Sequence, residues 1–237
     1  MIANRLFSIV LVILFHSCAA LCFAQSAVNY TTRIMVGDKP TYASESAFAV
    51  QGDMVNRTVS YYDLAKKLIR KETAQYKTRP LELLSLKLED YRLGSLQTVQ
   101  KQGNVYTIKQ RKTSSESLSE STVNAPGALS ASVMIQFLQQ HYDALAQGKE
   151  QKFEIVIASR SMTVEMVATK ERTETIRGVP CIVVKADLTS MIYRALAEPS
   201  YLYLEQAAPH RLMHYKGILP LPDDKGSQIS GTTTSSY

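Results

Sequence analysis

The sequence contains no tryptophan, only three cysteines, and no apolar run beyond its first two dozen residues that is long enough to span a membrane. Cys18 and Cys22 lie in that first stretch, so Cys181 is the single cysteine of the remainder. One cysteine excludes an internal disulfide framework, and a hydrophobic core must therefore stabilise the fold. The apolar run around Cys181 favours a buried, unreactive thiol, while an intermolecular bridge stays open.

Charge of one sign is not concentrated in any part of the sequence. The 27 basic and 21 acidic residues give a formal charge of +6, and many basic residues have acidic neighbours. This distribution predicts solvated faces rather than a nucleic-acid site. A modest positive charge favours anionic partners, such as lipid headgroups or surface glycans.

The N-terminus has the features of a secretory signal peptide. Arg5 precedes an uncharged apolar run from Leu6 to Leu14, and Cys22-Phe23-Ala24 offers the small residues that signal peptidase accepts. We expect residues 1–24 to be removed after Ala24, leaving 25–237 as one β-rich domain in the periplasm without a transmembrane segment. The alternatives are cleavage after Ala20, an uncleaved anchor, and lipidation of Cys18 or Cys22.

Alternation of apolar and polar residues dominates the rest of the chain and predicts strands. The pattern is clearest at 30–36, 42–51, 55–63, 81–92, 105–111, 152–158, 162–167, 178–186, 201–206 and 211–217. A turn at Asp223–Gly226 is expected before a polar tail. The segment Leu64–Lys77 fits either a helix or a hairpin, and we favour strand-turn-strand.

One principal helix is predicted over Ser132–Gln147. Met134, Phe137, Leu138, His141 and Leu145 recur at helical spacing on one stripe, and Gly148 can end the helix. Residues 112–126, rich in Ser, Thr and Glu, are expected to form an exposed loop. The sequence therefore predicts a mainly-β (α+β) fold, in which a curved antiparallel sheet or half-barrel carries one principal helix.

The order of these elements resembles an uncharacterised family of exported bacterial β-sheet proteins, related in fold to the open half-barrels of lipoprotein-localisation factors. The resembling motifs are Pro80-Leu81, Leu88–Gly94, Leu145–Lys149, Phe153–Arg160, Thr173–Gly178, Leu196–Pro199 and Pro209–Gly217. Tyr142 stands where the family often has a tryptophan. The resemblance implies the fold, an envelope location and an apolar cleft under the sheet, and it implies no activity.

Motifs that carry catalytic or metal chemistry are absent from the sequence. There is no Gly-x-Ser-x-Gly elbow and no glycine-rich phosphate loop, so we predict no catalytic residue, metal site or cofactor. His210 and His214 would lie on one strand face about 13 Å apart, too far to share an ion. His141 is expected to be a hydrogen-bonded core histidine. The pairs Glu89-Asp90 and Asp223-Asp224 are expected in turns or on the surface.

One candidate ligand site remains, at the hairpin that follows the helix. Met162, Val164 and Met166 alternate along one face, and Met134 and Phe137 come from the helix stripe. Arg160, in the turn between the two strands, can reach an anion, and pairing with a surface acid is the alternative.

These features predict a non-enzymatic periplasmic protein that binds a lipid, another amphiphile or an envelope protein on its curved sheet. The methionines of the candidate site suit an adaptable pocket, although methionine also fills gaps in cores. The alternative function is a hydrolase of an envelope polymer, for which two carboxyls with raised pKa values are expected in a polar cleft. A structural role in an envelope complex is a third reading.

Overall fold

The computed structural model describes residues 28–195 and 198–237, so the predicted signal segment 1–24 and the pair Leu196-Ala197 lie outside the described residues. The strands are β1 Val28–Val36, β2 Lys39–Gln51, β3 Met54–Tyr62, β4 Leu68–Thr78, β5 Leu81–Asp90, β6 Ser95–Gln102, β7 Val105–Arg111, β8 Ser119–Asn124, β9 Leu129–Ser130, β10 Gln151–Ile157, β11 Met162–Ile176, β12 Val179–Leu188, β13 Ser200–Glu205, β14 Leu212–Pro222 and β15 Gln228–Ser236.

These strands form one 15-stranded sheet in the order β8-β7-β6-β5-β4-β3-β2-β1-β15-β14-β13-β12-β11-β10-β9. Neighbours are antiparallel except β9 and β10, which are parallel. Every neighbouring pair is consecutive in sequence except β1 and β15, where Thr31–Met35 pairs with Thr232–Ser236. The end strands β8 and β9 do not pair with each other. The predicted mainly-β fold with a curved antiparallel sheet is confirmed.

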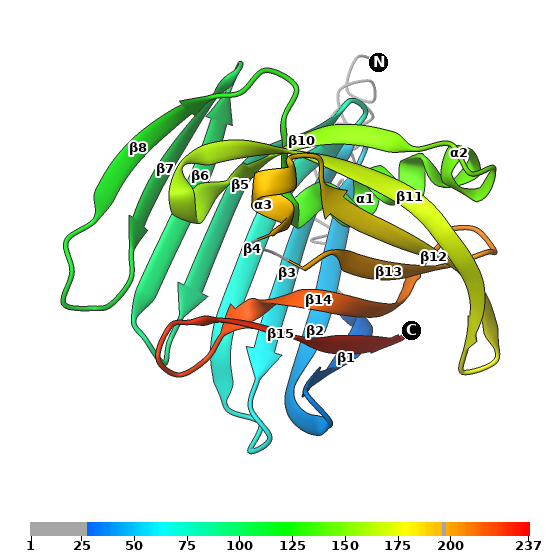
Figure 1. The fold of residues 1–237 in the computed structure, drawn as a ribbon. Coiled ribbons are helices and arrows are strands. Elements are labelled where there is room, and N and C mark those ends of the chain that lie inside the picture. The colour runs from blue at the N-terminus through cyan, green and yellow to red at the C-terminus, as the bar shows by residue number, and fades with distance from the viewer. Residues whose placement is uncertain (1–27, 196–197) are drawn as a thin grey trace, which may run out of the picture.

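The sheet bends back on itself, so that β10–β15 cross in front of β2–β5 (Figure 1). Bending brings the inner faces of both halves into one main core, to which Ile108 and Leu86 contribute from one half and Val184 and Leu202 from the other. Burial of this apolar surface is the main force that favours a folded-over sheet over a flat one. A second core cluster lies on the inner face of β1, β3, β4 and β14 and consists of Ile34, Val59, Tyr61, Ile69, Leu219 and Leu221.

The helical segment packs into the main core but is not the single helix predicted for Ser132–Gln147. It consists of a 3-10 turn at Ala131–Val133, α1 Met134–Gln140 and α2 Tyr142–Ala146. The break falls at His141, whose φ of −102° and ψ of 15° are not helical. Its Nδ1 donates a hydrogen bond of 2.9 Å to the carbonyl of Phe137.

Burial follows the predicted stripe in part. Its members Leu138 and Leu145 are fully buried, whereas Met134, Phe137 and His141 are partly exposed. Tyr142, which was not predicted on the stripe, is almost fully buried. A further short helix, α3 Met191–Arg194, follows β12. Within 28–195 and 198–237, none of the helices has the length and apolar character that crossing a bilayer requires.

Four strands escaped the sequence-based prediction. Part of the loop expected at 112–126 is β8, the polar tail is β15, Ser95–Gln102 forms β6, and Leu129–Ser130 forms the short strand β9. The side chains of β8, β15 and β6 are mostly Ser, Thr and Gln, and pairing with β7, β1 and β5 holds these three strands in the sheet despite their weak apolar alternation. The ambiguous segment Leu64–Lys77 is not a helix, and the favoured strand-turn-strand is also wrong: a turn at Leu64-Ala65 leads into the single strand β4.

Candidate functional site

Four of the five apolar residues predicted for a ligand site pack against the main core, from the β10–β11 hairpin and from α1. The fifth, Met162 at the start of β11, is partly exposed and is not among the residues packed against that core. Across the hairpin, Phe153 pairs with Met166, Ile155 with Val164 and Ile157 with Met162. The ring of Phe137 from α1 lies 4.7 Å from that of Phe153. Met134, Phe137, Val164 and Met166 all pack against the main core while remaining partly exposed. We call Phe137, Phe153, Ile155, Val164 and Met166 the hairpin strip.

Arg160 lies at the tip of the same hairpin, in the single 3-10 turn Ala158–Arg160. Its side chain is exposed, and no carboxylate of the described residues lies within 4.0 Å of it. The next residue, Ser161, adopts a left-handed conformation with a φ of 50°, and its hydroxyl lies 2.6 Å from that of Ser121 in β8. The hairpin tip therefore contacts β8, the strand at the far edge of the sheet, and carries the exposed guanidinium of Arg160.

The three histidines of the described residues, His141, His210 and His214, do not converge on one site. His210 precedes β14, stacks on Tyr142 at a ring distance of 3.6 Å and has a φ of 60°, so the prediction that it shares a strand face with His214 is wrong. Burial lowers the pKa of His214, whose Nδ1 lies 3.0 Å from the hydroxyl of Thr234. In the described part of the chain, no three His, Cys, Asp or Glu side chains are placed to hold a metal ion. Cys181 is free and fully buried, and burial raises the pKa of its thiol.

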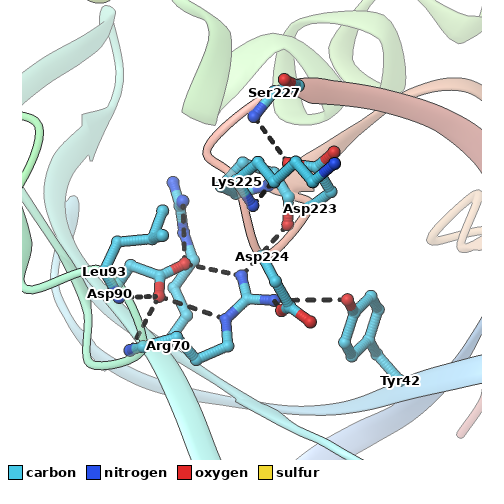
Figure 2. A network of polar contacts seen from close by, with 10 residues as sticks. Tyr42, Arg70, Asp90, Leu93, Asp223, Asp224, Lys225 and Ser227 are labelled. Atoms are coloured by element: carbon cyan, nitrogen blue, oxygen red, sulfur yellow. Dashed lines mark hydrogen bonds and ion pairs between the residues drawn. The ribbon is translucent and has the colours of Figure 1, made fainter.

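A polar network joins two turns at one end of the folded sheet (Figure 2). Asp90, at the end of β5, accepts hydrogen bonds from Nη2 and Nε of Arg92 at 2.8 and 3.2 Å. Arg92 in turn donates to the hydroxyl of Tyr42 at 3.2 Å, to Asp224 at 3.0 Å and to the Pro222 carbonyl at 3.1 Å. The network thereby fastens the β5–β6 turn to the β14–β15 turn and to β2.

Asp90 itself is buried, with only 2% of its surface exposed, so the prediction that the Glu89-Asp90 pair is a surface feature is wrong for this residue. Burial is tolerated because two guanidiniums face the carboxylate. Arg92 contacts it directly, and Nη1 of Arg70 lies 3.9 Å away. Buried charges are stable in proteins when they are paired in this way.

A second group of buried polar side chains lies between the two core clusters, and the sequence analysis missed it. Arg57 in β3 is 7% exposed and forms an ion pair with Glu72 in β4, which is 8% exposed. Buried hydroxyl groups from β1, β2 and β15 lie on the same inner face of the sheet. We call the group Arg57, Glu72, Thr32, Ser44, Ser46, Thr233 and Ser235 the polar belt. Arg57 follows Val55 and precedes Val59 at spacings of two, and that alternation alone would have placed it on the inner face.

Two open cavities accompany these features. One, of about 680 Å³, lies at the rim beside the end of α1 and is lined by Gly52, Asp53, Thr78, Arg79, Pro80, Leu81 and Gln140. The other, of about 510 Å³, is lined by consecutive residues of β3, β4, β5 and β6. Neither cavity is lined by residues of the hairpin strip, so a ligand there requires the partly exposed side chains to move apart.

The short helix α3 carries the most exposed large apolar side chains of the described residues. Met191 is 84% and Ile192 75% exposed. The helix follows the end of β12, where Leu188 pairs with Met166 of the hairpin strip. The exposed apolar group therefore lies close to the strip in the fold (Figure 1).

No family model matches the sequence, and no curated protein matches it. Among solved structures, the chain is similar to a β-barrel-like protein of the domain of unknown function DUF1849 from Brucella abortus, with 9% identity, 88% of this chain and 95% of that chain covered, and a TM-score of 0.43. It is also similar to a DUF1329 family protein from Desulfovibrio piger, with 8% identity, coverage of 88% and 82%, and a TM-score of 0.24. A porin-like protein from Bacteroides uniformis is 10% identical, with coverage of 87% and 96% and a TM-score of 0.23. The strand order and register of the chain itself define its fold.

Proposed function

We propose that this chain is a non-enzymatic protein that binds an amphiphile at the hairpin strip. The observation that carries the proposal is that Phe137, Val164 and Met166 of the hairpin strip pack against the main core yet remain partly exposed. The tip of the same hairpin carries the exposed side chain of Arg160. An acyl chain lies against Val164 and Met166, and an anionic headgroup pairs with Arg160. Partly exposed apolar surface gains free energy when a ligand covers it.

We further propose that the protein works in the cell envelope after export. The support is the N-terminal sequence, in which Arg5, an apolar run and Cys22-Phe23-Ala24 follow one another in the order of a signal peptide. N-terminal sequencing of the protein recovered from the periplasm should begin at Gln25. Recovery of an intact N-terminus embedded in the membrane would contradict this part of the proposal.

The binding function is tested by titrating the purified, exported protein with a fluorescent fatty acid. Met166→Gln places a polar amide on the strip and should weaken binding about tenfold, because roughly 1.4 kcal/mol of apolar contact is lost. The matched control is Val50→Gln, which makes the same kind of change at a side chain that is 67% exposed on β2, and it should leave the affinity unchanged.

The role of Arg160 is tested separately with the same titration. Arg160→Ala should weaken binding of the anionic probe about tenfold, and Arg160→Lys should recover only part of the loss, because lysine lacks the bidentate fork. Absence of saturable binding to the unmodified protein would refute the proposed function. Equal affinities of the unmodified protein and Arg160→Ala would remove only the role of Arg160.

A further inference from the structure

We propose that Arg57 and the polar belt form an internal site for the ester or amide carbonyl of an acyl lipid. This inference rests on the proposed function and names the chemical class of its ligand. It assigns a role to buried polar groups that neither the fold nor the hairpin strip accounts for.

Arg57 lies between the main core and the second core cluster. On one side of it in β3 is Val55, which belongs to the main core, and on the other is Val59, which belongs to the second cluster. Across the sheet it pairs with Phe48 in β2 and with Ala74 in β4. Both valines are buried, so an acyl chain that reaches the belt from either side displaces apolar core side chains, and the belt supplies the polar groups between the two clusters.

Arg57 has hydrogen-bonding capacity that the described residues do not use. Its guanidinium contacts Glu72, but its Nε is buried and has no hydrogen-bond partner among them. Burial lowers the pKa of the guanidinium, yet Glu72 and the nearby Tyr30, Tyr61 and Tyr76 raise it by more, so the group stays charged and keeps every N–H donor. A buried donor without an acceptor is costly, and native proteins almost always supply one.

The charge balance of the site selects the kind of acceptor. Glu72 already neutralises Arg57, so a second carboxylate or a phosphate would meet a negative charge within the belt. An uncharged oxygen acceptor does not meet this repulsion. The carbonyl that joins an acyl chain to its headgroup, in an ester or an amide, is an uncharged acceptor placed next to a long apolar chain.

The test compares two lipids that differ only in this carbonyl: 1-palmitoyl-lysophosphatidylglycerol and its 1-O-hexadecyl ether analogue. Both have the same anionic headgroup, so contacts to Arg160 cancel. Displacement of the neutral fluorescent probe N-phenyl-1-naphthylamine from the full exported protein measures both affinities. We expect the ester to bind about fivefold more tightly than the ether, which corresponds to one hydrogen bond.

Two variants then test whether the preference for the ester over the ether arises at Arg57. Arg57→Lys keeps the charge opposite Glu72 but removes Nε, and the double variant Arg57→Met with Glu72→Met removes donor and counterion together with side chains of similar length. Both should bind ester and ether equally. The matched control is Lys101→Met with Glu82→Met, an ion pair at 3.0 Å between β6 and β5 outside the belt, which should keep the ester preference.

The outcomes separate this inference from the proposed function. Equal binding of ester and ether by the unmodified protein overturns the internal carbonyl site and leaves amphiphile binding standing. Retention of the preference in Arg57→Lys and in the double variant, with both folded by circular dichroism, also overturns it. Failure of either lipid to displace the probe would refute the proposed function itself.

Discussion

The network around Asp90 makes a quantitative prediction about stability. In Arg92→Met, the buried carboxylate of Asp90 loses its two side-chain hydrogen bonds. It keeps the backbone amides of residue 92 at 3.1 Å and Leu93 at 3.4 Å, and the guanidinium of Arg70 at 3.9 Å. Breaking a buried ion pair by removal of one partner costs about 3–5 kcal/mol. Because 15% of the Arg92 side chain is exposed, we expect the lower part of this range, about 3 kcal/mol.

The matched control is Asp224→Asn, which removes the other acidic partner of the same guanidinium. The Asp224 side chain is 84% exposed, so its ion pair is screened by water and its loss should change the free energy of unfolding by less than about 0.5 kcal/mol. The contact of Arg92 with Asp90 is therefore expected to contribute to the free energy of unfolding, whereas its contact with Asp224 is not.

Urea denaturation followed by far-ultraviolet circular dichroism measures both variants. For a chain of this length, a loss of 3 kcal/mol lowers the melting temperature by roughly 6–12 °C. We expect Arg92 to stabilise the fold through the buried carboxylate of Asp90 and not through its contact with Asp224 in the β14–β15 turn. Equal losses of unfolding free energy in Arg92→Met and Asp224→Asn would refute this expectation.

Three further outcomes follow from the core and from titrating groups. Leu138→Ala, at a fully buried position, should cost about 2–5 kcal/mol in urea denaturation, whereas Ile192→Ala on α3 should cost less than about 0.5 kcal/mol. The buried thiol of Cys181, with its raised pKa, should react with a colorimetric disulfide reagent at pH 8 only after unfolding; rapid reaction of the folded protein would contradict its burial. Hydrogen bonding from Arg211 holds the pKa of Glu205 below its ordinary value, so Glu205 stabilises the fold above about pH 4.3 and less as the pH falls through its lower folded-state pKa. Glu205→Gln should therefore reduce the slope of stability against pH in acid, and an unchanged slope would contradict this assignment.

Local alternation in the sequence was sufficient to predict most strands and the curved sheet. It failed for the two-residue strand β9. It also failed for β6, β8 and β15, because an antiparallel ladder holds polar residues such as those of Gln228–Ser236 in place through backbone hydrogen bonds, whatever their apolar pattern. The helix face was predicted correctly in part, since Leu138 and Leu145 are fully buried. The break at His141 lies in the backbone dihedrals of that one residue, which apolar spacing alone does not reveal.

The candidate site was predictable only where its residues lie close together in sequence. Val164 and Met166 share a hairpin face with Phe153 because alternation and a short turn fix their register. The partners of Arg92 lie as far away as Asp224, and the polar belt gathers side chains from β1, β2, β3, β4 and β15. Such contacts depend on which distant strands pair, and no local pattern in this sequence specifies the β1–β15 pairing.

That single long-range pairing has a consequence for how the chain can be connected. β1 and β15 are antiparallel, so the start of β1 lies beside the end of β15, where Thr31 pairs with Ser236. A short linker could join them, and the exposed turn at Pro126-Gly127, between β8 and β9, could supply new ends. In such a circular permutant every strand of the sheet would pair only with its neighbours in sequence. The native connectivity thus delays the central pairing until both halves of the chain exist, whereas the permuted chain could build the same sheet strand by strand from one end to the other.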